Sequence, residues 1–304
     1  MNRLGRRAFV QAGGLVALLA AAPRAMGQTG GPASWRSRAV DSSRQPPLGQ
    51  SVLQWVIDAG PRSPKDKARD VWRHPEASLQ FWGLQPGQTV IDVDPGSGWF
   101  TEILAPYLDY TGGHYIAAVA DLSDPDVGDE GRRGRATFEA KFKDHPEVFG
   151  DVAMVGFGPH SGPLAPPGSV DLVLVARETH NWTGPGGLMH KALADFHDAL
   201  KPGGVLAIED HRAPDGADPT KGDGYISEAY MIAQARQAGF VLAARSDINA
   251  NPKDTKDYPF GVWTLPPTRQ SAPDGQPPNP GFDHSKYDAI GESDRMTLRF
   301  VKPA

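Results

Sequence analysis

Cysteine is absent from this chain of 304 residues. Its absence excludes disulfide bonds, thiolate metal sites, a cysteine nucleophile and a lipidated cysteine. The fold must therefore be stabilised by its core, which a hydrophobic content of 39% can supply.

An excess of positive charge is also missing. The chain has 31 Lys and Arg against 36 Asp and Glu, for a net charge of −5. No basic field indicates a nucleic-acid partner. Glycine (35) and proline (29), in contrast, are abundant and predict long loops.

Long apolar runs are lacking as well. The segment from Ala12 to Ala22 is shorter than the roughly 20 residues of a membrane span. It follows Arg6-Arg7 and precedes small residues, a pattern that resembles a twin-arginine export signal. We expect residues 1–27 to be a signal peptide, and the mature protein to be periplasmic or exported, without a membrane span. An ordinary secretory signal or an uncleaved anchor is the alternative.

Beyond the signal, the chain divides into two parts. Residues 28–50 are polar and rich in Gly, Pro, Ser and Arg, which predicts a flexible leader. From residue 51 to 304, apolar strands alternate with helices, which predicts a doubly wound parallel α/β sheet. We expect strands at 90–93, 115–120, 152–155, 170–176, 205–208, 240–244 and 296–301, and helices at 51–59, 65–82, 101–107, 132–142, 188–200 and 225–238. The Pro-rich stretch 249–295 interrupts this alternation as a functional or disordered insertion.

One strand leads into a glycine turn and then into a helix. The strand ends at Asp92, and the turn contains Gly96 and Gly98. Glycine lets the backbone approach a ligand closely, and the free N–H groups of a helix N-terminus attract negative charge. Three other Gly-x-Gly sequences in the chain lack this strand–turn–helix context. The pattern therefore favours a nucleotide site over a turn with a purely structural role, although Asp94 stands where such loops usually have their first glycine.

A second acid ends the next strand. Asp121 lies at the position from which a carboxylate can bind both ribose hydroxyls of a nucleotide. The alternative role for Asp121 is to cap the turn that follows it.

Together, these features resemble those of a known family. Asp92, the Gly96–Gly98 loop, Asp121 and the turn 200–204 (Leu-Lys-Pro-Gly-Gly) are similar to the motifs of class I S-adenosylmethionine-dependent methyltransferases. The stretch 95–108 resembles a group of predicted, often exported bacterial methyltransferases. The resemblance covers about residues 50–304. It implies a Rossmann-like seven-stranded sheet, mostly parallel, with an antiparallel last strand.

The resemblance also implies a cofactor, S-adenosylmethionine. The Gly96–Gly98 loop would lie beneath its amino-acid part, and Asp121 would hold its ribose. Asp94 would either repel the methionyl carboxylate or face the methionyl ammonium group.

Polar segments that follow the strands carry the expected chemistry. In a doubly wound sheet, ligands bind beyond the carboxyl ends of the strands, so residues 92–94, 177–182 and 209–212 should meet there. His180 is the first candidate for a general base and His211 the second, with a backbone-bonded loop histidine as the alternative for each. Asn181 and Trp182 are expected to orient an acceptor, and Tyr225 to belong to a lid.

A metal site is the less favoured option. Glu178, His180, Asp210 and His211 offer oxygen and nitrogen ligands, but no spacing motif supports a site, so no metal is expected.

The sequence thus predicts an S-adenosylmethionine-dependent methyltransferase that acts on a small molecule or an envelope component. A non-catalytic S-adenosylmethionine or nucleotide binding module is the second hypothesis, because the periplasm has no evident source of the methyl donor. A Rossmann-type oxidoreductase is the third. The missing third glycine and the antiparallel final strand argue against it.

Overall fold

The computed structural model describes residues 46–184 and 186–304. The expected signal peptide and most of the expected leader lie outside these residues. The first helix described, α2 (Val52–Ala59), begins after Ser51, whose hydroxyl accepts a hydrogen bond from the Gln54 N–H at 3.0 Å. This is a standard N-cap. In the described part of the chain, no helix combines the length and the apolar character that crossing a membrane requires.

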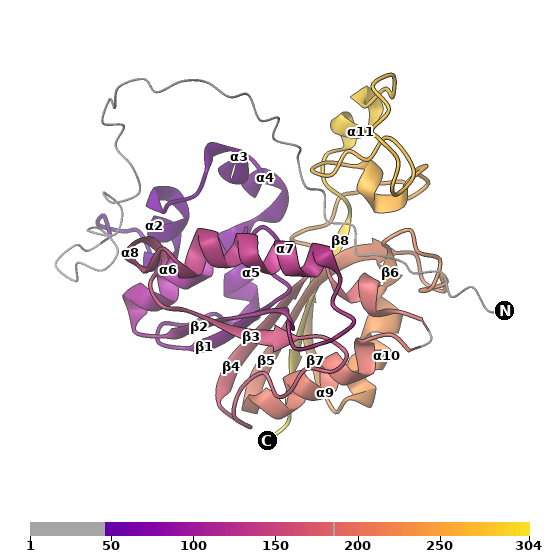
Figure 1. Ribbon diagram of the computed structural model, residues 1–304. Coiled ribbons are helices and arrows are strands. Elements are labelled where there is room, and N and C mark those ends of the chain that lie inside the picture. Colours follow the sequence, from indigo (N-terminus) through magenta and orange to yellow (C-terminus); the bar gives the residue numbers. More distant parts are fainter. Residues whose placement is uncertain (1–45, 185) are drawn as a thin grey trace.

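The elements alternate along the chain much as expected (Figure 1). The strands are β1 (Thr89–Val93), β2 (His114–Ala120), β3 (Val152–Phe157), β4 (Val170–Ala176), β5 (Leu200–Ala213), β6 (Ile226–Ser227), β7 (Val241–Ser246) and β8 (Arg295–Val301). The further helices are α3 (Pro64–Lys67), α4 (Asp70–Arg73), α5 (Pro75–Trp82), α6 (Thr101–Thr111), α7 (Asp129–Phe138), α8 (Pro146–Phe149), α9 (Met189–Ala199), α10 (Glu228–Gln237) and α11 (Ser285–Ile290). Short helical turns of other types are η1 (Glu139–Lys143), η2 (Thr179–Trp182) and η3 (Gly261–Thr264).

These strands form one sheet with the order β3-β2-β1-β4-β5-β8-β7. Strands β1 to β5 are mutually parallel, and β8 runs antiparallel between β5 and β7. The predicted doubly wound sheet with an antiparallel last strand is therefore confirmed. The two-residue strand β6 also pairs with β5, so the sheet has eight strands in place of the expected seven.

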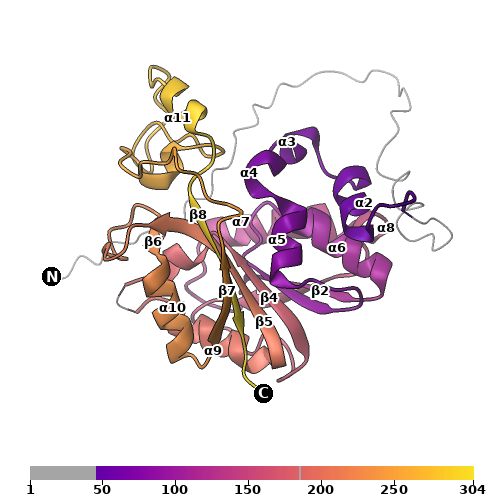
Figure 2. The ribbon, with the colours of Figure 1, turned by 180° about the vertical axis from the view of Figure 1, so that it is seen from behind.

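The sheet separates two hydrophobic cores. Along β1, Val90 packs into one core and Ile91 into the other, and both side chains are fully buried. Helices α2, α5 and α6 cover the first face, while α9 and α10 cover the second (Figures 1 and 2). Burial on both faces explains why the central strands are nearly continuous apolar runs.

Several predicted helices have different bounds: the expected 101–107 extends to Thr111, the expected 132–142 is Asp129–Phe138 followed by η1, and two others differ more. The expected helix 65–82 is divided into α3, α4 and α5. Its last break falls at His74, which has a φ of 39° and precedes Pro75, because a residue before proline avoids the helical conformation. The expected helix 225–238 begins later, at Glu228. Residues 226–227 instead pair with β5, and the Ser227 side chain caps the helix.

Strand β5 is longer than the predicted 205–208. The turn at 200–204 lies inside its bounds, as a bulge between the pairs Val170–Leu200 and Leu172–Val205. At its other end the strand continues through Asp210 and His211, which pair with Met296 and Arg295 of β8. The antiparallel strand therefore holds these two site residues in regular backbone geometry.

The Pro-rich insertion 249–295 is folded, with η3 and α11 inside it. The Asn251 side chain donates to the carbonyls of Ile290 at 3.0 Å and Glu292 at 2.7 Å. The buried Asp254 carboxylate accepts from the Tyr225 hydroxyl at 3.1 Å and from the Asp294 N–H at 2.8 Å. These contacts hold the insertion above the carboxyl edge of the sheet (Figures 1 and 2).

Candidate functional site

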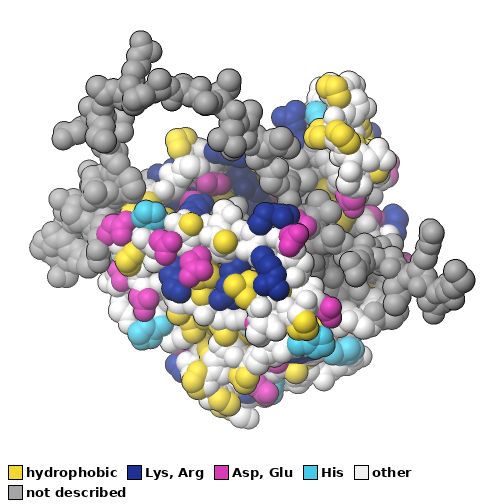
Figure 3. Space-filling view, in the orientation of Figure 1, with side chains coloured by type: hydrophobic (Ala, Val, Ile, Leu, Met, Phe, Trp, Pro, Cys, Tyr) yellow, Lys and Arg dark blue, Asp and Glu magenta, His cyan; other side chains and the backbone are white. Residues whose placement is uncertain are grey.

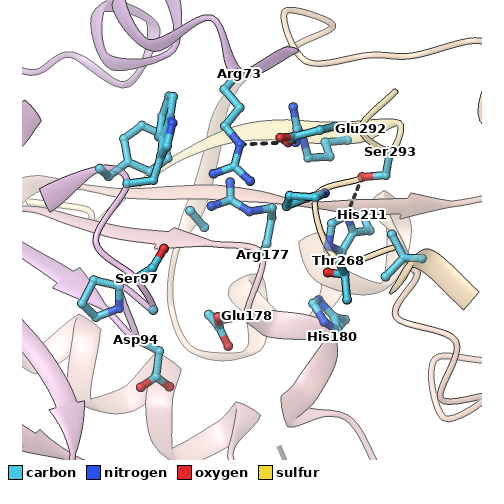
Figure 4. Close-up of a pocket in the computed structure, with 18 of the residues that line it drawn as sticks. Arg73, Asp94, Ser97, Arg177, Glu178, His180, His211, Thr268, Glu292 and Ser293 are labelled. Carbon is cyan, nitrogen blue, oxygen red and sulfur yellow. Dashed lines mark hydrogen bonds and ion pairs between the residues drawn. The ribbon is translucent and has the colours of Figure 1, made fainter. Parts of the chain in front are cut away.

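A pocket of about 280 Å³ lies at the carboxyl ends of β1, β4 and β5, beneath the insertion. All three predicted polar segments contribute to it. The lining comes from the loop after β1 (Asp94, Pro95, Gly96, Ser97, Trp99), the segment after β4 (Arg177, Glu178, His180, Asn181), His211 of β5, Arg69 and Arg73 of α3–α4, and the insertion (Val262, Trp263, Pro266, Pro267, Thr268, Glu292, Ser293) (Figure 4). Its position is the usual ligand crevice of an open α/β sheet.

The loop after β1 has an unusual backbone. Gly96 and Gly98 have φ values of 57° and 83°, and Asp94 has a φ of 44° in the same left-handed region. A Cβ atom placed on Gly98 would lie 2.2 Å from the Phe142 ring, so only glycine fits there. A non-glycine residue with positive φ is strained, and such strain concentrates at functional sites.

One side of the pocket carries three acids. The buried Asp92 accepts from the Tyr115 hydroxyl at 2.9 Å, and burial raises the pKa of Asp92 to about 7. Burial and the neighbouring Asp92 raise the pKa of Asp94 to about 7 as well. Burial and Asp94 hold the pKa of Glu178 well above its ordinary value. A cation placed beside these carboxyl groups would stabilise their ionised forms.

The Asp94 carboxylate accepts no hydrogen bond from any residue in the described part of the chain. In Figure 4, Asp94 and Glu178 lie on the same side of the pocket. An unsatisfied carboxylate on a strained loop is therefore available to a ligand.

On the opposite side, His180 pairs with an acid that is fully buried. The His180 Nδ1 lies 2.7 Å from Asp210 Oδ1. Burial alone would raise the pKa of Asp210, but His180 and His211 hold it well below its usual range. The ionised carboxylate can only accept, so we assign the Nδ1 proton to His180, which leaves its Nε2 as the basic nitrogen.

His211 lies beside this pair. Its ring centre is 5.1 Å from that of His180, and its Nδ1 is 2.6 Å from the Ser293 hydroxyl. Burial and the neighbouring His180 lower the pKa of His211 well below its ordinary value. His211 is therefore neutral at physiological pH, and His180 with its carboxylate is the better proton acceptor.

The residues that the sequence singled out are thus only partly brought together. Six of them line the pocket: Asp92, Asp94, Gly96, His180, Asn181 and His211. Gly98 does not line it but lets the loop pack closely against Phe142. Trp182 does not reach the pocket. It is 1% exposed and packs against Phe157 and Phe196 in the core. Tyr225 is also buried, with its hydroxyl on Asp254, so it anchors the insertion and does not face an acceptor.

Asp121 also lies outside the pocket lining. Its carboxylate accepts from the N–H and the hydroxyl of Ser123, at 3.0 Å and 2.8 Å, which lowers the pKa of Asp121. This is the turn-capping role that the sequence left open. Both hydrogen bonds go to Oδ1, which leaves Oδ2 for a ribose.

Replacement of Asp121 decides between these roles. If Asp121 holds a ribose, Asp121→Ala should weaken binding of S-adenosylhomocysteine by about 1–3 kcal/mol, the value of a charged hydrogen bond. Titration calorimetry measures the change. Ser123→Ala, which removes the hydroxyl donor of the cap and keeps the N–H donor and the carboxylate, is the control and should leave the affinity intact. Equal affinities of Asp121→Ala and the parent protein would exclude the ribose role.

The ligand atoms of His180, Asp210 and His211 lie within 4.8 Å of one another, a spacing that also suits a metal ion. Glu178, the fourth ligand that the sequence suggested, does not belong to this group. Both Asp210 oxygens already accept from protein donors, including the N–H groups of His180 and His211. This favours Asp210 as the partner of His180 over a role as a metal ligand.

Two sets of site residues were missed from the sequence. Asp210 was considered only as a metal ligand, although its place next to His211 on a strand marked it as part of the site. Arg177 was expected at the site only as part of the segment 177–182, with no role of its own, and Arg73 was not expected there. The one available signal was that Arg177 directly follows a buried strand.

No protein-family model matches this chain, and no curated protein matches it significantly. Solved structures do match. The 4+2 cyclase SpnF superimposes with a TM-score of 0.52 at 14% identity, over 81% of this chain and 84% of its own. A protein assigned as a sarcosine dimethylglycine methyltransferase from Galdieria sulphuraria gives 0.50 at 12% identity, over 81% and 90%. An S-adenosylmethionine-dependent methyltransferase from Aquifex aeolicus gives 0.49 at 18% identity, over 83% and 100%.

These likenesses define the fold. The mostly parallel sheet with its antiparallel C-terminal strand is the class I methyltransferase fold. Because one of the matching proteins is described as a cyclase, the fold by itself does not decide the reaction. The function has to be argued from the site.

Proposed function

We propose that this protein is an S-adenosylmethionine-dependent methyltransferase acting on a small molecule or an envelope component. The observation that carries the proposal is that the Asp92–Gly98 loop and the His180–Asp210 pair open onto one pocket. A cofactor loop and an oriented base at the same crevice meet the two requirements of methyl transfer to a protonated acceptor.

The residues of the acidic side fit the cofactor. S-adenosylmethionine carries a sulfonium and an ammonium group, and Asp92, Asp94 and Glu178 form a group of acids with raised pKa values. A cationic ligand offsets the cost of their ionisation. When bound, the cofactor supplies an electrophilic methyl group.

The remaining residues position the acceptor. His180 Nε2 takes the proton of the acceptor, and Asp210 stabilises the imidazolium that forms. Asn181 is exposed at the rim and offers an amide to the acceptor. The insertion covers the pocket with Trp263 and Pro267, which limits the access of water.

Titration calorimetry with S-adenosylmethionine and S-adenosylhomocysteine is the first test. Micromolar affinity is expected for both, and a well-folded protein that binds neither would contradict the proposal. A non-catalytic binding module would bind them but release no S-adenosylhomocysteine with any acceptor. An oxidoreductase would bind NAD(P) in their place. The His180–Asp210 pair favours the enzyme over the silent module, because a binding module has no need of an oriented base.

Affinity for S-adenosylmethionine should rise with pH between about 6 and 7.5. Asp92 and Asp94 have pKa values of about 7, so they are largely protonated at pH 6 and ionise as the pH rises. The cation binds their ionised forms, so below pH 7 the affinity should change up to about tenfold per pH unit for each coupled proton. Calorimetry in buffers with different ionisation enthalpies also reports the protons released.

Asp94→Asn is the matched variant for this effect, because it keeps the shape of the side chain and removes its charge. We expect it to weaken binding about tenfold at pH 7.5 and to reduce the pH dependence. Tighter binding in Asp94→Asn would show that Asp94 repels the methionyl carboxylate, which is the other role that the sequence allowed.

We also propose that the protein is exported. The support is the twin-arginine pattern at Arg6-Arg7 with the apolar segment that follows it. Fractionation of cells that produce the full chain, compared with an Arg6→Lys, Arg7→Lys variant, tests this.

A further inference from the structure

Four arginines gather along one wall of the pocket. Arg69 and Arg73 come from the α3–α4 segment, Arg177 follows β4, and Arg295 begins β8. Arg73 is 3% exposed and Arg295 is 1% exposed. On the outer face drawn in Figure 3, basic and acidic side chains are instead interspersed. The four guanidinium groups therefore gather in the pocket, in contrast to the mixed charges on that face.

Two buried carboxylates pair with these arginines. Glu292 contacts Arg69 Nε and Arg73 Nε, both at 2.8 Å, and Arg295 at 2.7 Å. Glu209 contacts Arg177 at 3.0 Å and Arg295 at 2.7 Å. Arg69 also lies 3.9 Å from Asp66, so the four arginines have three carboxylate partners and the wall keeps an excess of positive charge.

Arg73 has N–H donors that no protein group in the described part of the chain accepts from. Its Nε donates to Glu292, and its terminal nitrogens have no hydrogen-bond partner among residues 46–184 and 186–304. Its guanidinium lies 5.0 Å from the centre of the Trp99 ring, which holds it in place. Figure 4 shows the guanidinium groups of Arg73 and Arg177 pointing toward one another inside the pocket. Burial and the nearby Arg177 lower the pKa of Arg73. An anion between the two guanidinium groups would raise that pKa again.

Arg62 offers a comparison in the same neighbourhood. It also lies over Trp99, at 4.8 Å, but its two terminal nitrogens bind both oxygens of Asp70, at 2.7 Å and 2.6 Å. Arg62 does not line the pocket. The terminal nitrogens of Arg62 are therefore occupied by a carboxylate, whereas those of Arg73 face the pocket.

We propose that the acceptor substrate is an acidic small molecule whose carboxylate or phosphate group binds between Arg73 and Arg177. This inference rests on the proposed methyl transfer and names its substrate class. Planar guanidinium groups bind such oxyanions through paired hydrogen bonds. Arg177 lies three residues before His180, so an anion held there places the rest of the acceptor near the basic nitrogen.

The methionyl carboxylate of the cofactor is the competing occupant. Arg177 follows β4 and Arg295 begins β8, on the histidine side of the glycine loop, and Figure 4 shows Arg177 between Ser97 and His211. This position favours the acceptor.

Anion binding by the whole protein, saturated with S-adenosylhomocysteine, is the test. The probes are malonate and inorganic phosphate, and calorimetry measures their binding. We expect binding in the parent protein, at least about tenfold weaker binding in Arg177→Gln, and an affinity for S-adenosylhomocysteine within about threefold of the parent. Arg62→Gln is the matched control and should bind the anions normally.

Folding of the variants is checked first. The Arg177 side chain is 18% exposed and its partner Glu209 keeps Arg295, so Arg177→Gln should fold. Arg177→Lys is the second variant. It keeps the charge and loses the paired geometry, so it should show intermediate affinity.

Two results would overturn the inference. The first is a protein that binds S-adenosylhomocysteine but neither anion, which leaves the proposed function intact. The second is displacement of the anion by S-adenosylhomocysteine, together with a lower affinity of Arg177→Gln for S-adenosylhomocysteine. The affinity of this variant for 5′-methylthioadenosine, which lacks the amino-acid part, would be unchanged. That pattern would assign the arginines to the methionyl carboxylate. Failure of S-adenosylhomocysteine to bind at all would refute the proposed function and the acceptor assignment together.

Discussion

His180→Gln is expected to lower the rate of methyl transfer by about 10²–10⁴-fold, the usual contribution of a general base. The affinity for S-adenosylmethionine should change little, because Asp94 lies on the other side of the pocket (Figure 4). The rate is followed as release of S-adenosylhomocysteine, with an acceptor first found by screening small carboxylic and phosphorylated compounds. Glutamine keeps a hydrogen-bonding group in place but cannot take the proton.

The controls separate catalysis from packing. His190→Gln replaces an exposed histidine of α9 and should have no effect. Asp210→Asn removes the carboxylate that stabilises the imidazolium, so the rate should fall in this variant as well. A rate unchanged in His180→Gln would eliminate His180 as the base. Loss of cofactor affinity equal to the loss of rate would indicate a structural role.

Gly98→Ala should lower the free energy of unfolding by about 2–5 kcal/mol, from left-handed strain of about 1–2 and overpacking of about 1–3 kcal/mol. Two features of this position explain the expected loss of stability. Gly98 has a φ of 83°, and a Cβ atom there would meet the Phe142 ring at 2.2 Å. Phe142 is fully buried, so it cannot move aside. Because the same loop faces the pocket, binding of S-adenosylhomocysteine should weaken too. Urea denaturation measures the first effect and calorimetry the second.

Gly112→Ala is the matched control, at the other end of α6. Gly112 has a φ of 77°, but nothing lies within 4 Å of a Cβ atom placed there. Its replacement should cost only the left-handed strain of about 1–2 kcal/mol and leave binding unchanged. Equal losses of stability in the two variants would show that the contact between the loop and Phe142 is not tight.

Much of the fold could be predicted from local sequence. Strand β4 has the predicted bounds 170–176, because a run buried on both faces is apolar throughout. The parallel order followed from the alternation of strands and helices. The errors occurred where long-range pairing overrides local preference. Residues 209–213 belong to β5 because β8 and β6 pair with them, and the apolar pattern of β5 contains no sign of these partners.

The site residues can also be divided into those that the sequence predicts and those that it does not. Convergence of Asp92, His180 and His211 could be predicted, because the carboxyl ends of parallel strands meet at one edge. The roles of Trp182 and Tyr225 could not, since an aromatic residue in a loop turns either into the core or toward the ligand. In this protein both turn inward.

The sequence by itself determined the α/β sheet, the glycine loop and the edge at which polar residues collect, because these depend on local periodicity and on the backbone freedom of glycine. Only the tertiary structure decided which charges meet. Arg73 and Glu292 are 219 positions apart and share a hydrogen bond, and Asp210 orients His180 from a neighbouring strand. Electrostatic energy depends on distance in space, and on how much water the fold removes between two groups. Neither the distance between two groups nor the water between them can be read from the order of residues along the chain.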